Sequence, residues 1–111
     1  MKNILILLYI LLSTAFTWGQ KHNKLYYNKM EKANKEILYE NYSAALPLFS
    51  ELYAMDSSNI DISYKLGLCI FKVRRESQES FNYFYKAKNQ YPAANFYLGR
   101  LYHAQQKFNK A

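Results

Sequence analysis

Apolar side chains recur along most of the chain at the three- and four-residue spacing that is typical of helices with one buried face. Short polar segments interrupt this pattern, which predicts helices over residues 24–39, 42–55, 60–73, 77–90 and 93–104, with another beginning near residue 107. Only three glycines and two prolines occur among the 111 residues, a composition that favours a helical domain over a sheet-rich or disordered chain. We therefore predict a single small all-α domain.

Local signals refine the first three predicted helices. Asn41 can cap the second helix, and either Ser58 or Asn59 can cap the third. Pro47 lies several residues inside the second helix, where it lacks a backbone donor and should kink the helix. The first helix fits two registers, because its apolar positions suit the pattern better when shifted by one residue.

Small and large residues recur at matching places in successive helices. The small ones are expected where two antiparallel helices approach closely, and they are Ala45, Gly67, Ser80, Gly99 and Ala111. The large ones are expected to fill the space between helix pairs, and they are Phe49, Leu66, Phe84, Leu98 and Tyr102. The step from Ala45 to Ser80 is 35 residues and that from Gly67 to Gly99 is 32, so the extra residue is predicted in the turn around residues 74–77.

This order of landmarks resembles the tetratricopeptide repeat, a pair of helices with a period of about 34 residues. The matching positions are Ser63, Leu66, Gly67, Ile70, Ser80, Phe84, Pro92, Asn95, Leu98, Gly99, Tyr102 and Ala111, after a weaker half-repeat with Ala45, Phe49 and Ser57. The resemblance implies an antiparallel helix-pair solenoid of about two and a half repeats over residues 26–59, 60–91 and, partially, 92–111. Because such solenoids usually have about three repeats and a polar cap, we expect the natural protein to continue.

The first twenty residues follow the plan of a secretory signal peptide, with a positive start, an apolar stretch and a smaller, more polar end. Small residues predict cleavage after Gly19, which gives a signal peptide over residues 1–19 and a short segment over residues 20–25. No cysteine follows the cleavage site, so a lipoprotein anchor is not expected. The alternative is an uncleaved membrane anchor, although the 13 residues from 4 to 16 are fewer than the roughly 20 that span a bilayer as a helix.

The stretch FTWGQ, the richness in Lys and Tyr, and the segment YSAALPLFSELYAMDSSNIDISYKLGLCIFK are similar to the start of Bacteroidota envelope proteins. In that family, tetratricopeptide repeats precede a β-propeller-like region and an OmpA-like domain that binds peptidoglycan, and some members serve type IX secretion. No propeller or OmpA residues occur here, so peptidoglycan would be bound only by domains absent from this chain. The resemblance implies an exported, non-catalytic module of a larger periplasmic or outer-membrane protein, with a protein or peptide partner in the envelope.

Motifs and charge favour no catalytic chemistry. Cys69 lies among apolar residues, and His22 and His103 lie near the two ends of the chain, so no Cys-His nucleophile signature is present. There is no Gly-rich phosphate loop, HExxH motif or paired metal-ligand motif, and we expect no enzyme activity, small-molecule substrate, cofactor or metal. The net charge of +7 is scattered along the chain and forms no basic patch. Of the three functions considered, a protein-binding module, a membrane-attached adaptor and a nucleic-acid binder, the last is therefore the least favoured.

The repeat phase predicts a concave groove, lined by the first helix of each pair and suited to an extended peptide or a partner helix. Its predicted residues are Tyr64, Leu68 and Phe71 from one helix and Phe96, Arg100 and His103 from the next. Aromatic and Arg side chains are the usual anchors of such contacts. The alternative is that Tyr64 and Phe96 mainly pack the two helices together. Repeats that clamp a carboxylate use Lys and Asn at these positions, so that ligand is not expected.

Overall fold

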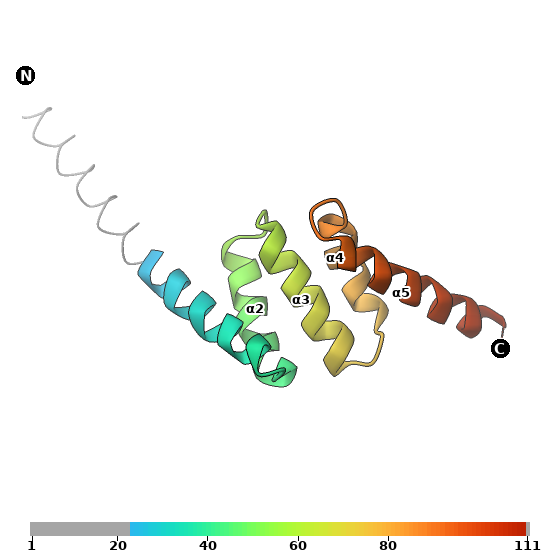
Figure 1. Ribbon diagram of the computed structural model, residues 1–111, viewed down its shortest axis with the longest axis horizontal. Coiled ribbons are helices and arrows are strands. Elements are labelled where there is room, and N and C mark those ends of the chain that lie inside the picture. Colours follow the sequence, from blue (N-terminus) through green and yellow to red (C-terminus); the bar gives the residue numbers. More distant parts are fainter. Residues whose placement is uncertain (1–22, 111) are drawn as a thin grey trace, which may run out of the picture.

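The computed structural model describes residues 23–110, which form a row of helices and contain no strand (Figure 1). A helix over residues 23–38 is followed by α2 (Tyr42–Met55), α3 (Ile60–Val73), the short 3-10 helix η1 (Gln78–Ser80), α4 (Phe81–Ala87) and α5 (Pro92–Lys110). The described chain is therefore all-α, and α2 and α3 have the predicted bounds. The predicted signal peptide, residues 1–19, and the next three residues lie outside the described part, as does Ala111.

Two predicted helix boundaries are wrong. The predicted helix over 77–90 is shorter and consists of η1 and α4, because a turn over residues 88–90 precedes Pro92, which disfavours helical geometry in the residue before it. The predicted break near residue 106 does not occur, and α5 continues as one helix to Lys110. The segment AQQK at residues 104–107 contains neither Gly nor Pro and consists of good helix formers, so nothing there ends the helix.

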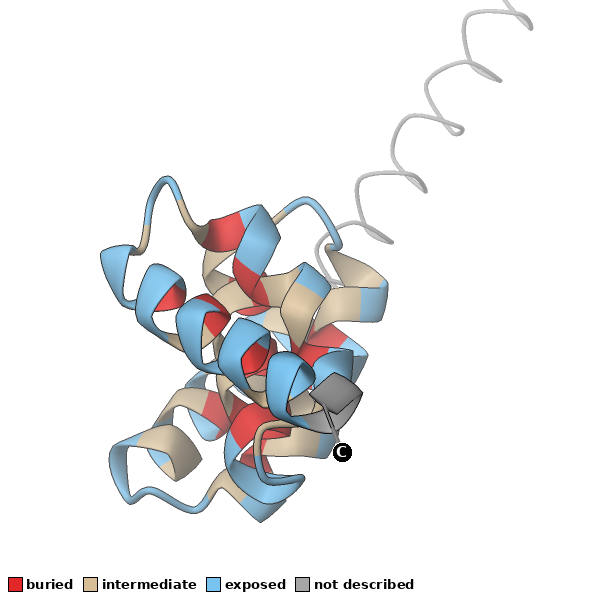
Figure 2. Cartoon of the chain, turned by 90° about the vertical axis from the view of Figure 1, so that its right-hand side faces the viewer, coloured by how far each residue is buried: buried red, intermediate tan, exposed pale blue. Residues whose placement is uncertain are grey.

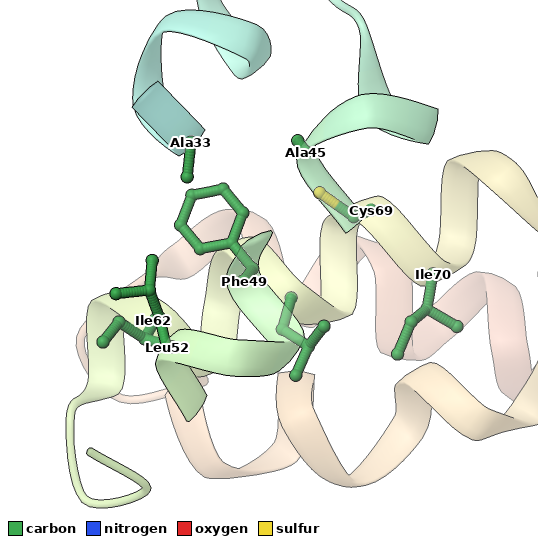
Figure 3. Packing of buried hydrophobic residues seen from close by; sticks show 8 residues of the cluster. Ala33, Ala45, Phe49, Leu52, Ile62, Cys69 and Ile70 are labelled. Carbon is green, nitrogen blue, oxygen red and sulfur yellow. The ribbon is translucent and has the colours of Figure 1, made fainter. Parts of the chain in front are cut away.

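The core consists of two clusters of buried residues on either side of α3. One cluster joins the helix over 23–38, α2 and α3, and it contains Ala33, Ala45, Phe49, Leu52, Ile62, Leu66, Cys69 and Ile70 (Figure 3). The other joins α3, α4 and α5, and it contains Phe71, Phe84, Ala87, Ala94, Leu98 and Leu101. Because α3 contributes to both clusters, it is the central helix of the described chain.

Burial repeats at equal spacing along the chain. Ala45, Phe49 and Leu52 of α2 are fully buried, and so are the residues 35 positions later, Ser80, Phe84 and Ala87. Leu66 of α3 and Leu98 of α5 are buried in the same way, 32 positions apart. The predicted interior roles of the landmarks Ala45, Phe49, Leu66, Ser80, Phe84 and Leu98 are therefore confirmed. Tyr102 does not follow its predicted role, because its side chain is half exposed.

The caps and the proline agree only partly with the sequence signals. Asn59 is the N-cap of α3, and its side-chain oxygen accepts a hydrogen bond from the Ile62 N–H at 3.1 Å. Asn41 lies at the N-cap of α2, but its side chain makes no capping hydrogen bond. Pro47 is exposed and does not interrupt α2, which runs as one helix past it.

The turn after the helix over 23–38 and the turn after α3 each follow the first helix of a pair, and they differ in backbone conformation. The turn after the helix over 23–38 has one left-handed residue, Glu40, with φ of 56°. The turn after α3 has two in succession, Arg75 with φ of 48° and Glu76 with φ of 61°. This is the turn in which the sequence predicts the extra residue of the longer step. Left-handed backbone is costly for residues other than glycine, so the second turn holds the more strained conformation.

Candidate functional site: the groove on α5

The helix α5 has one buried face and one open face. Ala94, Leu98 and Leu101 are buried against α4 and α3, as expected for residues at helical spacing. The opposite face, seen in Figure 2 from the α5 end of the molecule, is exposed along most of its length. A groove of about 910 Å³ lies on this face. We call it the α5 groove, and its lining residues are Glu76, Asn95, Phe96, Gly99, Arg100, His103, Ala104 and Lys107.

Gly99 forms the open floor of the α5 groove. A Cβ atom added at Gly99 would meet nothing within 4 Å. A Cβ atom added at Gly67, the matching position of α3, would lie 3.1 Å from Tyr83 Cβ and 3.3 Å from the Phe84 ring. The predicted close approach of two helices is therefore confirmed at Gly67. At Gly99 no described helix covers α5 where α4 covers α3, so the close approach stays a prediction there.

Arg100 links the groove to the strained turn after α3. Its Nε donates a hydrogen bond to Glu76 Oε1 at 2.9 Å, and its Nη2 contacts the same oxygen. Both side chains are partly exposed, so water screens the pair and it contributes little to stability. Its effect is on position: Glu76 holds the guanidinium of Arg100 against the wall of the groove. Lys107 adds a second positive side chain farther along α5.

The six predicted site residues do not line one common groove. Phe96, Arg100 and His103 line the α5 groove, and Phe96 is 62% exposed. Phe71 is buried, and Tyr64 and Leu68 pack against the cluster between α3 and α5. The α3 half of the prediction is therefore part of the core. The alternative role for Tyr64 and Phe96 was to pack the two helices together. Tyr64 has this role, whereas Phe96 is exposed.

Aromatic stacking and a polar chain explain the position of Tyr64. Its ring stacks on that of Tyr91 with centroids 4.6 Å apart. Tyr91 Oη in turn donates a hydrogen bond to Asp61 Oδ1 at 2.6 Å, and Lys65 Nζ lies 2.9 Å from the other oxygen of Asp61 and 2.8 Å from Asn34 Oδ1. The hydrogen bond to Asp61 raises the pKa of Tyr91 to about 12. These contacts tie the helix over 23–38, α3 and the start of α5 together.

The cysteine and the histidine of the described chain lie on different helices, α3 and α5. Cys69 is fully buried in the first cluster, and burial raises the pKa of its thiol to about 12. His103 lies on the open face of α5, and His22 is outside the described residues. Among residues 23–110, no group of three or more His, Cys, Asp or Glu side chains is placed to hold a metal ion. The arrangement at the α5 groove is suited to contact and charge recognition.

Sequence reasoning missed several residues of the groove for two different reasons. Asn95, Ala104 and Lys107 share the open face because they fall at helical spacing from Phe96 and Gly99, and extending that spacing along an unbroken helix would have found them. The predicted break near residue 106 separated Lys107 from this helix, whereas Asn95 and Ala104 lay inside the predicted helix over residues 93–104 and were not assigned to the groove. Glu76 carried no such signal, since it lies in a turn 24 residues before its partner Arg100.

No helix within residues 23–110 combines the length and the apolar character needed to cross a membrane. Comparisons of the chain with protein-family models, with curated proteins and with solved structures give no match.

Proposed function

We propose that this chain is a helix-pair solenoid of the tetratricopeptide type that serves as a non-catalytic protein-binding scaffold. The observation that carries the proposal is the matched burial of α2 with α4 and of α3 with α5 at steps of 35 and 32 residues. Solenoids are built from such equivalent units, each of which packs on its neighbours and leaves extended surfaces for partners. The alternation of a small residue with a large one within each unit is the same feature that produced the sequence resemblance.

The open face of α5 supports the binding role. It combines an exposed aromatic side chain, Phe96, with a paired guanidinium, Arg100, around a floor formed by Gly99. Aromatic and Arg side chains beside a concave surface are the common anchors of protein recognition. The site belongs to one face of one helix, in place of the two-helix groove that the sequence predicted.

The proposed setting is the cell envelope, with the chain as the N-terminal module of a larger protein similar to the Bacteroidota OmpA-like family. The support for this setting is the sequence of residues 1–19 and the composition of the chain. The alternative is an adaptor that keeps its signal as a membrane anchor. N-terminal sequencing of the protein recovered from the host cell distinguishes the two, since the first gives a chain that begins at Gln20 and the second one that begins near Met1.

Capture of envelope proteins tests the scaffold function. The full chain immobilised on resin should retain a partner from an envelope extract, and the double substitution Phe96→Ala with His103→Ala should reduce that capture about tenfold or more. The substitution Leu38→Ala is the matched control, because it removes an apolar side chain that is 77% exposed on the first helix. Capture that is equal for all three proteins, or that disappears at moderate salt for all of them, would contradict the proposal and favour binding by charge alone.

A further inference from the structure

We propose that the turn after α3 is a processing site, at which an Arg-specific protease hydrolyses the peptide bond that follows Arg74 or Arg75 in the folded chain. In this step the C–N bond breaks, the hydroxyl of one water molecule joins the carbonyl carbon, and its proton joins the nitrogen. The inference is independent of the scaffold function, because it rests on the residues, the backbone and the contacts of this turn.

The fold leaves these two arginines accessible. The chain contains three arginines, and two of them are adjacent in this turn. Proteases of this class hold the arginine side chain in a pocket that carries a carboxylate, and they cut most readily at exposed loops. Arg74 and Arg75 are exposed beyond the end of α3. Arg100 lies inside α5, so a protease could cut after it only if that helix unwound.

The backbone of the turn lowers the free energy needed to open it. A protease binds its substrate in an extended conformation, in which φ is negative. Arg75 and Glu76 have φ of 48° and 61°, and left-handed backbone is unfavourable for both residue types. Opening the turn therefore releases strain. The turn after the helix over 23–38 has one left-handed residue, and the turn over 88–90 has none, so less strain is released there.

Few contacts oppose the opening of this turn. The Glu76 N–H donates a hydrogen bond to the Phe71 carbonyl at 3.0 Å. Arg74 pairs with Glu79, and Glu76 pairs with Arg100, but all four side chains are partly exposed, so both ion pairs contribute little to stability. None of residues 74–77 is buried. Local opening is therefore expected to need far less free energy than unfolding of the two clusters.

The two pieces of the cut chain should stay together, because α3 packs on helices that follow the turn. The Phe71 ring lies 6.1 Å from the Phe84 ring and 4.9 Å from the Tyr97 ring, measured between centroids. Ser63 Oγ also donates a hydrogen bond to the Tyr83 carbonyl at 3.0 Å. Cleavage would therefore remove the covalent link between α3 and α4 and keep their packing, which is processing as opposed to degradation.

Limited proteolysis of the full chain tests the proposal. The folded chain is incubated with an Arg-specific endoprotease, and mass spectrometry identifies the first bond that is cut. We expect that bond to follow Arg74 or Arg75, and we expect both fragments to elute together in size-exclusion chromatography. The double substitution Arg74→Gln with Arg75→Gln should abolish this cut. In the host cell, a fragment that begins at residue 75 or 76 should be recovered from the unchanged chain and not from the double variant.

A matched pair of variants tests the role of strain. Arg75→Asn and Arg75→Ala both leave Arg74 as the only arginine in the turn, but Asn adopts left-handed backbone more readily than Ala. Each rate is divided by that of a synthetic peptide with the same residues 69–81, which measures cleavage of the open turn. On this scale, Arg75→Asn should be cut several times more slowly than Arg75→Ala.

A third variant tests exposure alone. Lys88→Arg places an arginine in the turn over 88–90, which has no left-handed residue. Divided by the rate of its own matching peptide, cleavage after position 88 should be slower than cleavage in the turn after α3.

Four results would overturn the inference. Equal rates for Arg75→Asn and Arg75→Ala would mean that strain does not control the opening of the turn. Cleavage after position 88 in Lys88→Arg that is as fast as cleavage in the turn after α3 would mean that any exposed turn is cut. Fragments that separate on the column would show degradation. Absence of the fragment from the host cell would show that no protease uses the site there.

Discussion

The central helix α3 and the last helix α5 have the same inner face and different outer ones. Leu66 and Cys69 of α3 are buried just as Leu98 and Leu101 of α5 are, at a constant offset of 32 residues. The opposite side of α3 is covered by α4, whereas the opposite side of α5 is open and contains Gly99. The comparison shows that the recurring small and large residues predict which position a residue takes within its own helix. Whether that residue also stabilises the fold depends on whether a neighbouring helix packs against it.

The largest expected contrast is between the aromatic residues of the covered and the open face. Phe84→Ala should lower the free energy of unfolding by about 3 to 5 kcal/mol, because it removes a fully buried ring from the second cluster. Phe96→Ala should change it by no more than about 0.5 kcal/mol, since that ring is 62% exposed. Urea unfolding followed by circular dichroism measures both. Because Phe84→Ala can unfold so small a domain, Phe84→Leu provides a milder variant whose loss should still exceed that of Phe96→Ala.

The two glycines provide the next contrast. Gly67→Leu should destabilise the chain by about 1 to 3 kcal/mol, because the new side chain has no room beside Tyr83 and Phe84. Gly99→Leu should instead be neutral or stabilising by up to about 1 kcal/mol, since it replaces an exposed glycine inside a helix by a good helix former. Thermal melts of the two variants make the comparison directly. Equal losses would mean that α5 is covered in solution and that the difference between the two faces does not exist.

The smallest expected effect concerns the inner contacts at the start of α5. Tyr91 donates a hydrogen bond to Asp61, which raises its pKa in the folded chain from 10.0 to about 12. A raised pKa in the folded state means that the contribution to stability is complete below pH 10 and is lost as pH rises from there toward 12. Tyr91→Phe should therefore lower stability by less than about 1 kcal/mol at pH 8, and the difference from the unchanged chain should disappear by about pH 12.

Urea unfolding at several pH values measures that difference, and Tyr39→Phe is the control because its side chain is 70% exposed in the turn after the first helix. A difference that stays constant from pH 8 to pH 12 would show that the hydroxyl of Tyr91 contributes no titratable interaction in solution.

Local pattern was enough to predict the helices and most of their buried faces. The bounds of α2 and α3 and the burial of Phe49 and Phe84 follow from periodicity, because helical spacing determines which residues share a face. The end of the second predicted pair was misplaced, since whether residues 88–90 form a turn or a further helical turn depends on weak local preferences near Pro92.

The site was harder to predict because it depends on tertiary neighbours. Phe71 of α3 and Phe96 of α5 are both aromatic residues that the sequence predicted to line the groove. Phe71 is buried and Phe96 is exposed. The difference comes from Tyr97 and Phe84, which pack against Phe71 and which no local pattern assigns to it. The contact between Glu76 and Arg100 likewise depends on the turn in which Arg75 and Glu76 are left-handed. Left-handed backbone is unfavourable for Arg and Glu, so the sequence gives no signal for this turn.

The burial of Cys69 makes its thiol a natural probe of how often the surrounding helices separate. It is the only cysteine in the sequence, and its thiol is both inaccessible and held almost entirely in the unreactive protonated form. A thiol reagent can therefore label the chain only during the moments when the helix over 23–38 or α2 separates from α3. When reclosing is faster than the reaction, the labelling rate divided by that of the unfolded chain is the equilibrium constant for this opening. Labelling of the Cys69 thiol thus measures the stability of the first cluster, which joins the helix over 23–38, α2 and α3. Unfolding monitored at α5 measures the stability of the C-terminal part of the described chain.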